Sequence, residues 1–252
     1  MALNLKSPDD IKKMAHAGSI LAKVLQRVRK VVKPGVRTKD LDELANKLVL
    51  SYKARPAFLG YVSGGRRYPA SLCVSVNEEI VHGLPSDRVL AVGDVVGLDF
   101  GVIYDGWYAD SAITLPVGPV HPQAARLLAV TERALQIGIE AARVGSTVGD
   151  IGHAIQVYAE HQGFSVVRDL VGHGIGRALH EDPQVPNFGN ANEGAKLQAG
   201  MVIAIEPMLS AGGKAITLAD DGWTYKTADE SLSAHFEHTI AITKKGPKVL
   251  TR

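Results

Sequence analysis

One histidine and four acidic residues have the side-chain types and the sequence surroundings expected of a metal site. They are Asp99, Asp110, His173, Glu206 and Glu237. Asp99 follows the apolar run 95–98, and Glu206 follows the apolar run 201–205. A carboxylate at the inner end of an apolar strand is costly to bury unless a positive charge meets it. Because Glu237 supplies a third such acid, the pattern predicts a carboxylate-rich site for two metal ions.

The spacing of the first two acids supports this interpretation. Asp105-Gly106 is a strong signal for a two-residue hairpin turn between apolar runs. Counting outward from that turn places Asp99 opposite Ala112. Asp110 then becomes the diagonal neighbour of Asp99 on one sheet face, with the two backbones roughly 7–8 Å apart. Two carboxylates at that separation can bridge metal ions about 3.5–4 Å apart, which is the spacing found in two-metal hydrolases.

The chain also repeats its own pattern. Three pairs of segments correspond in the same order, namely 34–41 with 144–151, 93–99 with 200–206, and 110–114 with 237–241. Each half therefore predicts two helices followed by two acid-bearing strands. We interpret this as an old duplication with pseudo-repeats at about 7–118 and 119–252. The two halves are expected to face each other within a single catalytic domain, residues 1–252, and to contribute acids to one shared cleft.

Hydrophobic periodicity and capping signals predict the elements that position these residues. Ser7-Pro8 predicts the start of a first helix, and Lys33-Pro34-Gly35 predicts its end. Further helices are predicted from about Thr38, after His121-Pro122 and around 151–158. Strands are predicted near 71–76, 95–110, 164–167, 201–206 and 238–242. Residues 58–68 lose periodicity and contain the run Gly64-Gly65-Arg66-Arg67, so they predict a mobile loop.

Composition limits the classes of function. The chain has 252 residues, 46% hydrophobic content and a net charge of +2, which is enough apolar material for a substantial core. Without a long basic block, nucleic acid is not the expected partner. The single cysteine, Cys73, excludes an internal disulfide and fits a reducing compartment. A signal-peptide core and an apolar stretch of roughly 20 residues that could span a bilayer are both missing, so a cytoplasmic protein without membrane contact is expected.

Three histidines are candidates for chemistry, with unequal support. His173 lies in Gly172-His173-Gly174, where small neighbours would leave its ring accessible, and imidazole is a common metal ligand. Alone, a histidine in this setting is more often structural, but the four acids at repeated positions favour a ligand. His180 and His82, taken alone, are each more often solvated residues than functional ones.

These residues, in this order, resemble type I methionine aminopeptidase, and the bacterial form most closely. The motifs that carry the resemblance are Asp99, Asp110, Gly172-His173-Gly174-Ile175-Gly176, His180, Glu206-Pro207-Met208 and Glu237-His238-Thr239. The resemblance covers essentially the whole chain. It implies an α/β (α+β) pita-bread fold, in which two pseudo-symmetric αβ halves surround a central antiparallel sheet with helices on the outer face.

The resemblance also implies roles for individual residues. Asp99, Asp110, His173, Glu206 and Glu237 would be the metal ligands, and Glu206 would also shuttle a proton. His180 would stabilise the developing oxyanion, and His82 would hold or protonate the amide nitrogen. The methionine pocket would be formed by Phe58, Tyr61, Tyr68, Cys73, Leu179 and Trp223. Cys73 is equally well explained by the sequence as a small buried core thiol.

The implied cofactors are two divalent ions, with a monovalent cation near Asn77 and Ser233. Four acids and one imidazole accept manganese, iron, cobalt or zinc, so the ligand types do not name the metal. Compared with the family pattern, Phe58 and Leu179 are unusual, and the 61–68 loop is several residues longer and rich in glycine and arginine.

The implied substrates are N-terminal methionyl peptides and nascent chains whose second residue is small, and the ribosome is a candidate partner. A monomer is the simplest expectation. Two alternatives remain. One is another pita-bread metallopeptidase, a Xaa-Pro aminopeptidase or dipeptidase, although those usually carry a large extra N-terminal domain. The other is a catalytically silent binding relative, although such proteins typically lose ligand acids and all five positions are filled here.

Overall fold

A computed structural model of the chain describes residues 4–252, and this range contains four α-helices. They are α1 (Pro8–Arg29), α2 (Thr38–Ser51), α3 (Pro122–Ala141) and α4 (Val148–His161). The starts of α1 and α4 are capping boxes, in which Ser7 pairs with Asp10 and Thr147 pairs with Asp150. The four predicted helices are therefore confirmed, and the first three begin where the sequence placed their starts, at Pro8, Thr38 and Pro122.

The strands form several small sheets around the two long strands of a central hairpin. The first sheet contains β1 (Arg55–Pro56), β4 (Leu72–Val76), β6 (Val95–Tyr104) and β7 (Trp107–Pro116). The second has the order β10 (Glu181–Val185), β9 (Gly172–Gly174), β11 (Val202–Ile205), β16 (His238–Thr243) and β17 (Gly246–Val249). A third sheet contains β8 (Ser165–Val166), β12 (Met208–Ser210) and β15 (Ser233–His235). A fourth contains β5 (Glu79–Val81), β13 (Ile216–Leu218) and β14 (Tyr225–Thr227).

The hairpin of β6 and β7 has the register that the Asp105-Gly106 turn predicts. Asp99 pairs with Ala112, and Asp110 pairs with Gly101, so the two acids are diagonal neighbours on one face. The even-numbered residues of β6, from Val96 to Val102, point the other way into a core shared with α1 and α2. The expectation that Asp99 ends its strand was wrong, because β6 continues to Tyr104 and alternation alone turns the carboxylate away from that core.

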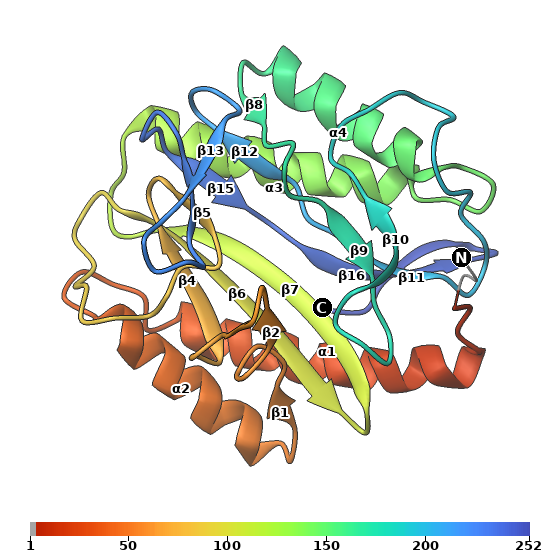
Figure 1. Cartoon of the computed structure of the whole chain (residues 1–252), viewed down its shortest axis with the longest axis horizontal. Coiled ribbons are helices and arrows are strands. Elements are labelled where there is room, and N and C mark those ends of the chain that lie inside the picture. The colour runs from red at the N-terminus through yellow and green to blue at the C-terminus, as the bar shows by residue number, and fades with distance from the viewer. Residues whose placement is uncertain (1–3) are drawn as a thin grey trace.

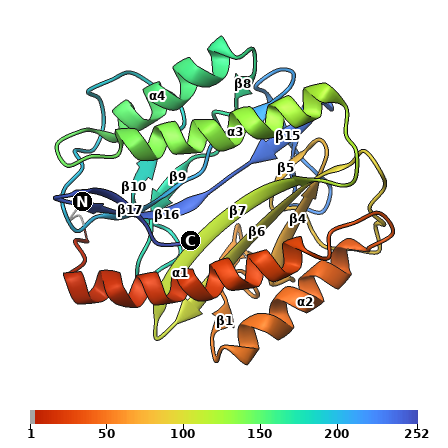
Figure 2. The same ribbon diagram turned by 180° about the vertical axis from the view of Figure 1, so that it is seen from behind.

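The second half repeats this arrangement. Helices α3 and α4 cover a core that includes residues of β11 and β16, and those two strands pair antiparallel. Glu206 follows the last residue of β11, and Glu237 precedes the first residue of β16, so the second pair of acids sits at the same end of its strand pair. Figures 1 and 2 show the two helix pairs at opposite edges of the molecule, with the strands between them. The expected fold of two αβ halves is confirmed.

Three hydroxyl groups join the two halves along β7. Thr114 Oγ1 donates to the carbonyl of His235 at 2.6 Å, and Ser111 Oγ donates to the carbonyl of Glu237 at 2.6 Å. Thr239 Oγ1 donates to the carbonyl of Asp110 at 2.8 Å and accepts from its backbone N–H at 3.0 Å. Because these bonds use backbone groups next to the acids, they fix the acid-bearing strands of both halves relative to each other.

Residues 58–68 differ from their prediction as an irregular mobile loop. They contain a short hairpin in which β2 (Val62–Ser63) pairs with β3 (Arg66–Arg67). Gly64 and Gly65 form its turn at φ values of 55° and 77°, which glycine adopts without strain. Two-residue strands are too short to leave a periodic signal, which is why the sequence pattern failed to show this hairpin.

We expect Thr239→Val to destabilise the protein by about 1–3 kcal/mol, because it leaves two buried backbone groups of Asp110 without their partner. The shape of the side chain is nearly unchanged, so the loss reports the hydrogen bonds. Thr217→Val is the matched control on the exposed strand β13 and should change the free energy of unfolding by less than about 0.5 kcal/mol. Chemical denaturation of both variants measures this, and equal effects would contradict a role for the hydroxyl in joining the halves.

Candidate metal centre

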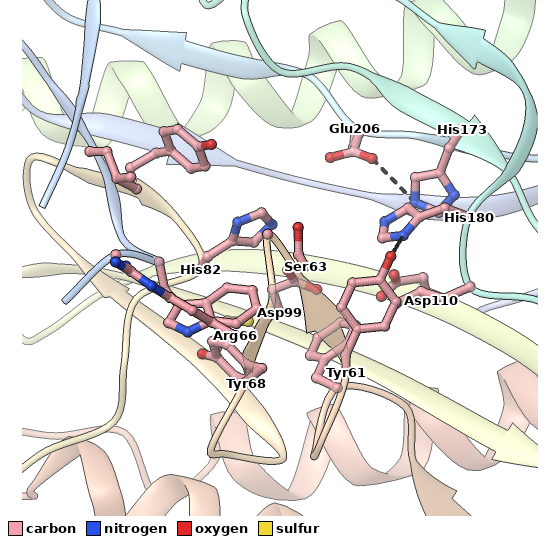
Figure 3. Close-up of a pocket in the computed structure, with 18 of the residues that line it drawn as sticks. Tyr61, Ser63, Arg66, Tyr68, His82, Asp99, Asp110, His173, His180 and Glu206 are labelled. Carbon is pink, nitrogen blue, oxygen red and sulfur yellow. Dashed lines mark hydrogen bonds and ion pairs between the residues drawn. The ribbon is translucent and has the colours of Figure 1, made fainter.

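A cavity of about 600 Å³ contains all five candidate ligands on its lining. Asp99 and Asp110 come from the first half, whereas His173, Glu206 and Glu237 come from the second half. Figure 3 shows Asp110, His173 and Glu206 turned toward the same part of this cavity. The structure therefore brings together the residues that the sequence placed at repeated positions.

Three of these residues already have the spacing of a metal cluster. Asp110, His173 and Glu237 each offer one ligand atom, and these atoms lie within 4.8 Å of one another. Glu206 Oε1 is 3.6 Å from His173 Nε2. Asp99 lies beside Asp110, whose negative charge contributes to raising the pKa of Asp99. All five side chains can thus contribute donor atoms to one small volume.

The surroundings of His173 orient its ring. Its Nδ1 lies 2.9 Å from the carbonyl oxygen of Gly174, so Nδ1 carries the proton and Nε2 presents its lone pair toward Glu206. The sequence analysis explained Gly172 and Gly174 by access to the His173 ring, whereas the structure shows a packing requirement at both positions. A Cβ on Gly172 would collide with the carbonyl oxygen of Ala204, and a Cβ on Gly174 would collide with that of Asp182. The glycines are required because neighbouring backbones pack tightly against β9.

The four carboxyl groups lie close together, with Asp110 and Glu237 buried and Asp99 and Glu206 half-buried at the cavity. Burial raises the pKa of Glu206 to about 8, and burial together with the charge of Glu206 raises the pKa of Asp110 to about 8. Burial and the neighbouring acids raise the pKa of Asp99 and of Glu237 well above the usual range. Within residues 4–252, one oxygen each of Asp99, Asp110 and Glu237 is buried without a hydrogen-bond partner.

Unpartnered buried oxygens are costly, and they normally have a protein, water or ion partner. A set of hard oxygen donors with one neutral imidazole fits divalent cations, because the ions would supply the missing positive charge and accept the free lone pairs. Burial lowers the pKa of His173 to about 3, so its ring is neutral, as a ligand requires. The residues present therefore fit a divalent metal centre.

His235 belongs to this environment and was missed by the sequence analysis. Its Nε2 lies 3.6 Å from Glu206 Oε2, and burial lowers its pKa to about 3. The available signal was its position two residues before Glu237, since residues two apart in an extended segment share a face. His235 is the last residue of β15, and its ring contacts the same carboxylate that faces His173.

Two further histidines line the cavity beside the acids. The ring centroid of His180 is 4.3 Å from that of His173, and its Nδ1 lies 2.6 Å from the hydroxyl of Tyr61. His82 follows β5 at a φ of 59°, and burial lowers its pKa to about 4. Burial also lowers the pKa of His180. Both rings are therefore neutral near pH 7 and can act as hydrogen-bond donors through one nitrogen.

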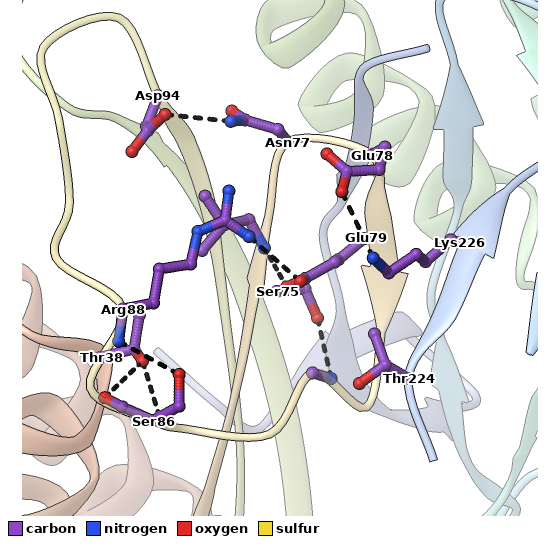
Figure 4. A network of polar contacts seen from close by, with 12 residues as sticks. Thr38, Ser75, Asn77, Glu78, Glu79, Ser86, Arg88, Asp94, Thr224 and Lys226 are labelled. Atoms are coloured by element: carbon purple, nitrogen blue, oxygen red, sulfur yellow. Dashed lines mark hydrogen bonds and ion pairs between the residues drawn. The ribbon is translucent and has the colours of Figure 1, made fainter. Parts of the chain in front are cut away.

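Polar contacts secure the segment that carries His82 (Figure 4). Arg88 pairs with Glu79 at 3.1 Å, and Lys226 pairs with Glu78 at 3.4 Å, so the turn before β5 is tied to the neighbouring loop and to β14. Ser75 Oγ accepts from the backbone N–H of Gly83 at 3.1 Å. These contacts hold the backbone on both sides of His82.

The six residues expected to form an apolar pocket all line this same cavity. They are Phe58, Tyr61, Tyr68, Cys73, Leu179 and Trp223. The rings of Tyr68 and Trp223 meet edge to face at 5.2 Å, and burial raises the pKa of the Cys73 thiol, which keeps it neutral. The lining also contains residues that the sequence analysis did not select, namely Ser63, Gly64, Arg66, Leu218, Gly222 and Tyr225.

Asn77 and Ser233 lie together, away from the cavity lining. The hydroxyl of Ser233 is 3.2 Å from the carbonyl oxygen of Asn77 and 3.0 Å from that of Glu79. The backbone N–H of Ser233 also donates to the carbonyl oxygen of Asn77 at 3.0 Å, so each of the two carbonyls has a donor. The side chain of Asn77 is occupied by Asp94 and the backbone of Val95.

No helix within residues 4–252 has the length and apolar character needed to cross a membrane.

Comparison with known proteins gives a consistent result. Metallopeptidase family M24 matches residues 12–244 of the chain. The methionine aminopeptidase of Aquifex aeolicus is 51% identical to it, and the alignment covers 100% of this chain and 99% of that relative. The crystal structure of methionine aminopeptidase from Rickettsia prowazekii matches with a TM-score of 0.97 and 43% identity over 100% of both chains.

A structural match at lower sequence identity covers only part of the other protein. The prolidase from Pyrococcus horikoshii OT3 matches with a TM-score of 0.80 at 23% identity, and the match covers 98% of this chain but only 63% of that protein. A likeness at that identity shows the fold alone. The shared architecture confirms the expected pita-bread fold, and the proline-directed alternative is not favoured because the full-length relatives at higher identity are of the other kind.

The raised pKa values predict how the metal-free protein responds to pH. Asp110 and Glu206 keep their protons up to about pH 8 in the folded state but release them near pH 4 when unfolded, so the folded state binds more protons between these values. Buried neutral histidines such as His173 and His235 oppose this effect below pH 7, because they bind a proton only when unfolded. The free energy of unfolding should therefore fall as the pH rises from 7 to 8. Because a divalent ion replaces those protons, adding Mn²⁺ should raise the melting temperature more at pH 8 than at pH 5.

Thermal unfolding of chelated protein at pH 5, 7 and 8, with and without Mn²⁺, measures this difference. Asp110→Asn is the comparison variant, and it should show a smaller metal-induced shift. A metal-free protein that becomes more stable between pH 7 and 8, with no response to metal, would contradict the assignment of this site.

Proposed function

The chain belongs to metallopeptidase family M24, among the methionine aminopeptidases, and we propose that it removes the N-terminal methionine of nascent proteins and peptides when the second residue is small. The observation that carries this proposal is the juxtaposition of a buried cluster of four carboxylates and one imidazole with an aromatic pocket in one cavity. An exopeptidase that recognises a methionine side chain needs both parts next to each other.

The proposed ligands are Asp99, Asp110, His173, Glu206 and Glu237, which would hold two divalent ions. Divalent ions in such a site lower the pKa of water and polarise a peptide carbonyl. Manganese, iron, cobalt and zinc all suit this donor set. We further propose that Asn77 and Ser233 contribute to a monovalent-cation site, because the Ser233 hydroxyl oxygen lies close to the carbonyl oxygens of Asn77 and Glu79.

Glu206 is the proposed proton shuttle. In the metal-free protein, burial raises the pKa of this carboxyl to about 8, so its surroundings favour a bound proton more than water does. His173 and His235 flank its two oxygens at 3.6 Å each, which restricts the carboxyl to one orientation. The proton taken up on the Glu206 carboxylate would then be delivered to the leaving amine.

His180 is the proposed donor to the oxyanion, and its neighbour Tyr61 can set its tautomer. When the Tyr61 hydroxyl donates to Nδ1 at 2.6 Å, the neutral imidazole carries its proton on Nε2 and can donate it to substrate oxygen. The opposite arrangement would leave Nε2 as a bare acceptor, unable to stabilise negative charge. His82, on the other side of the cavity, is the proposed partner of the amide nitrogen.

The proposed methionine pocket combines aromatic edges with a neutral thiol. Tyr68 contacts both Phe58 and Trp223 edge to face, and Cys73 is buried within the same cluster. Aromatic rings and sulfur suit the flexible, polarizable thioether of methionine. The crowding of this pocket against the acids leaves room for only a small second residue.

The setting of the protein follows from the proposed activity. We propose a single catalytic domain that works in the cytoplasm as a monomer on new chains leaving the ribosome. Lys214 and Lys226 lie in a region that also carries Asp220 and Asp221, so any ribosome contact would depend on a mixed charge pattern. Co-sedimentation with ribosomes at low and moderate salt tests that contact, and a protein that stays in the supernatant at both would exclude it.

The proposed activity predicts metal-dependent release of methionine from Met-Ala-Ser. The metal-loaded enzyme should cleave this peptide at least 100-fold faster than Xaa-Pro peptides. Asp110→Asn should cut turnover by about 100-fold or more, in line with the loss of one strong transition-state interaction, while leaving the circular dichroism spectrum unchanged. Faster cleavage of the proline series, or full activity of the exhaustively chelated enzyme, would overturn the proposal.

The proposed role of Tyr61 predicts a specific pattern of kinetic effects. Tyr61→Phe keeps the ring in the pocket but removes the hydroxyl, so it should lower kcat about tenfold with little change in KM. His180→Ala should lower kcat by about 100-fold or more, because it removes the donor itself.

A double-variant comparison separates this role from a simple packing role. If Tyr61 acts through His180, Tyr61→Phe combined with His180→Ala should be no slower than His180→Ala alone. Additive losses in the double variant would show that the hydroxyl acts independently of the imidazole.

A further inference from the structure

Arg66 has a position that the proposed chemistry does not use. It lies in β3 of the short hairpin, it lines the cavity, and its side chain is exposed, so it stands where the cavity opens to solvent. Within residues 4–252, it is the one lining residue whose side chain is a permanent cation, because the histidines of the cavity are neutral. Figure 3 shows its guanidinium beside Tyr68, at the end of the cavity away from His173 and Glu206.

The structure makes room for this guanidinium. Gly222, in the turn between β13 and β14, has a φ of 73°, and a Cβ at that position would overlap the guanidinium of Arg66. The arginine therefore packs directly against the backbone of this turn, next to Trp223 of the proposed methionine pocket. Its side chain bridges the two hairpins that border the opening of the cavity.

The charge of Arg66 is available to a ligand. None of the ion pairs among residues 4–252 includes Arg66. In the opposing turn, Asp221 already accepts hydrogen bonds from the backbones of Trp223 and Thr224 and from the hydroxyl of Thr224. An unpaired guanidinium at the edge of a partly enclosed cavity is a good partner for a carboxylate, which it can bind through two parallel hydrogen bonds.

When the amino terminus of a peptide is bound in this cavity, the rest of the peptide must pass the hairpins β2–β3 and β13–β14 at the opening. Its first residue would occupy the aromatic pocket beside the acids, and its second residue would lie against the histidines. The residues that follow can only extend toward the opening, where Arg66 stands. The opening that admits the amino terminus must also accommodate the downstream residues. This inference rests on the proposed aminopeptidase function.

We propose that Arg66 forms a carboxylate-binding subsite at the opening of the cavity, which favours substrates with an acidic residue shortly after the second position. The carboxylate can come from an aspartate or glutamate side chain or from the carboxyl terminus of a very short peptide. The neighbouring Arg67 does not line the cavity, so it serves as a matched control with the same charge on the same strand.

The test compares amidated peptides that differ in one charge. The metal-loaded wild-type enzyme should cleave Met-Ala-Asp-Ser-amide with a kcat/KM three- to tenfold higher than that for Met-Ala-Asn-Ser-amide at low salt. The ratio should fall toward one at high salt, because exposed charges are screened. Arg66→Gln should abolish the preference by lowering kcat/KM for the aspartate peptide, whereas Arg67→Gln should preserve it.

A second arm identifies the source of the carboxylate. Met-Ala-Ser with a free carboxyl terminus is compared with its amide, and a preference for the free acid that Arg66→Gln removes would assign the subsite to terminal carboxylates as well. A wild-type ratio of one in both arms, or the same ratio in Arg66→Gln, would overturn the subsite alone. Failure to cleave any of these methionyl peptides would overturn the proposed function and this inference together.

Discussion

The mutual burial of four carboxyl groups in one cavity is the constraint on which this structure depends. Burial raises the pKa of all four groups, neighbouring acids raise it further for three of them, and three of their oxygens are buried without a hydrogen-bond partner. Such a cluster persists only where rigid elements hold it and where cations can offset its charge. The acids therefore sit on or beside the best-packed strands, and the surrounding backbone has no freedom to turn them outward.

Two halves of the chain share the work of holding the cluster. Each half presents two acids from an antiparallel strand pair, and each covers the opposite side of its strands with a pair of helices. The hydroxyl groups of Ser111, Thr114 and Thr239 bridge the halves through backbone carbonyls next to the acids. A displacement of one half along the other would break these bonds and would also move the carboxylates apart. The contact between the halves therefore determines both the stability of the protein and the geometry of the site.

The sequence predicted this arrangement where it carried a periodic or turn signal. The Asp105-Gly106 turn gave the register of β6 and β7, and the repeated glycine-to-acid spacing gave the relation between the halves. It failed for short elements. The hairpin of β2 and β3 has two residues per strand, and β9 and β13 have three, which is too short for alternation to show. The role of Gly172 and Gly174 also depends on backbones far away in sequence, at Ala204 and Asp182, which no local pattern contains.

The parts of the cavity differ in how tightly the fold constrains them. The acids and His173 lie on or directly beside buried core strands, so a substitution near them changes both stability and charge balance. The hairpins β2–β3 and β13–β14 lie at the opening, and β2 and β3 are exposed along their length. A residue such as Arg66 can therefore change without disturbing the core strands. This separation allows the reactive centre to stay fixed while the contacts with the departing part of a peptide vary, because the two depend on elements that share few packing partners.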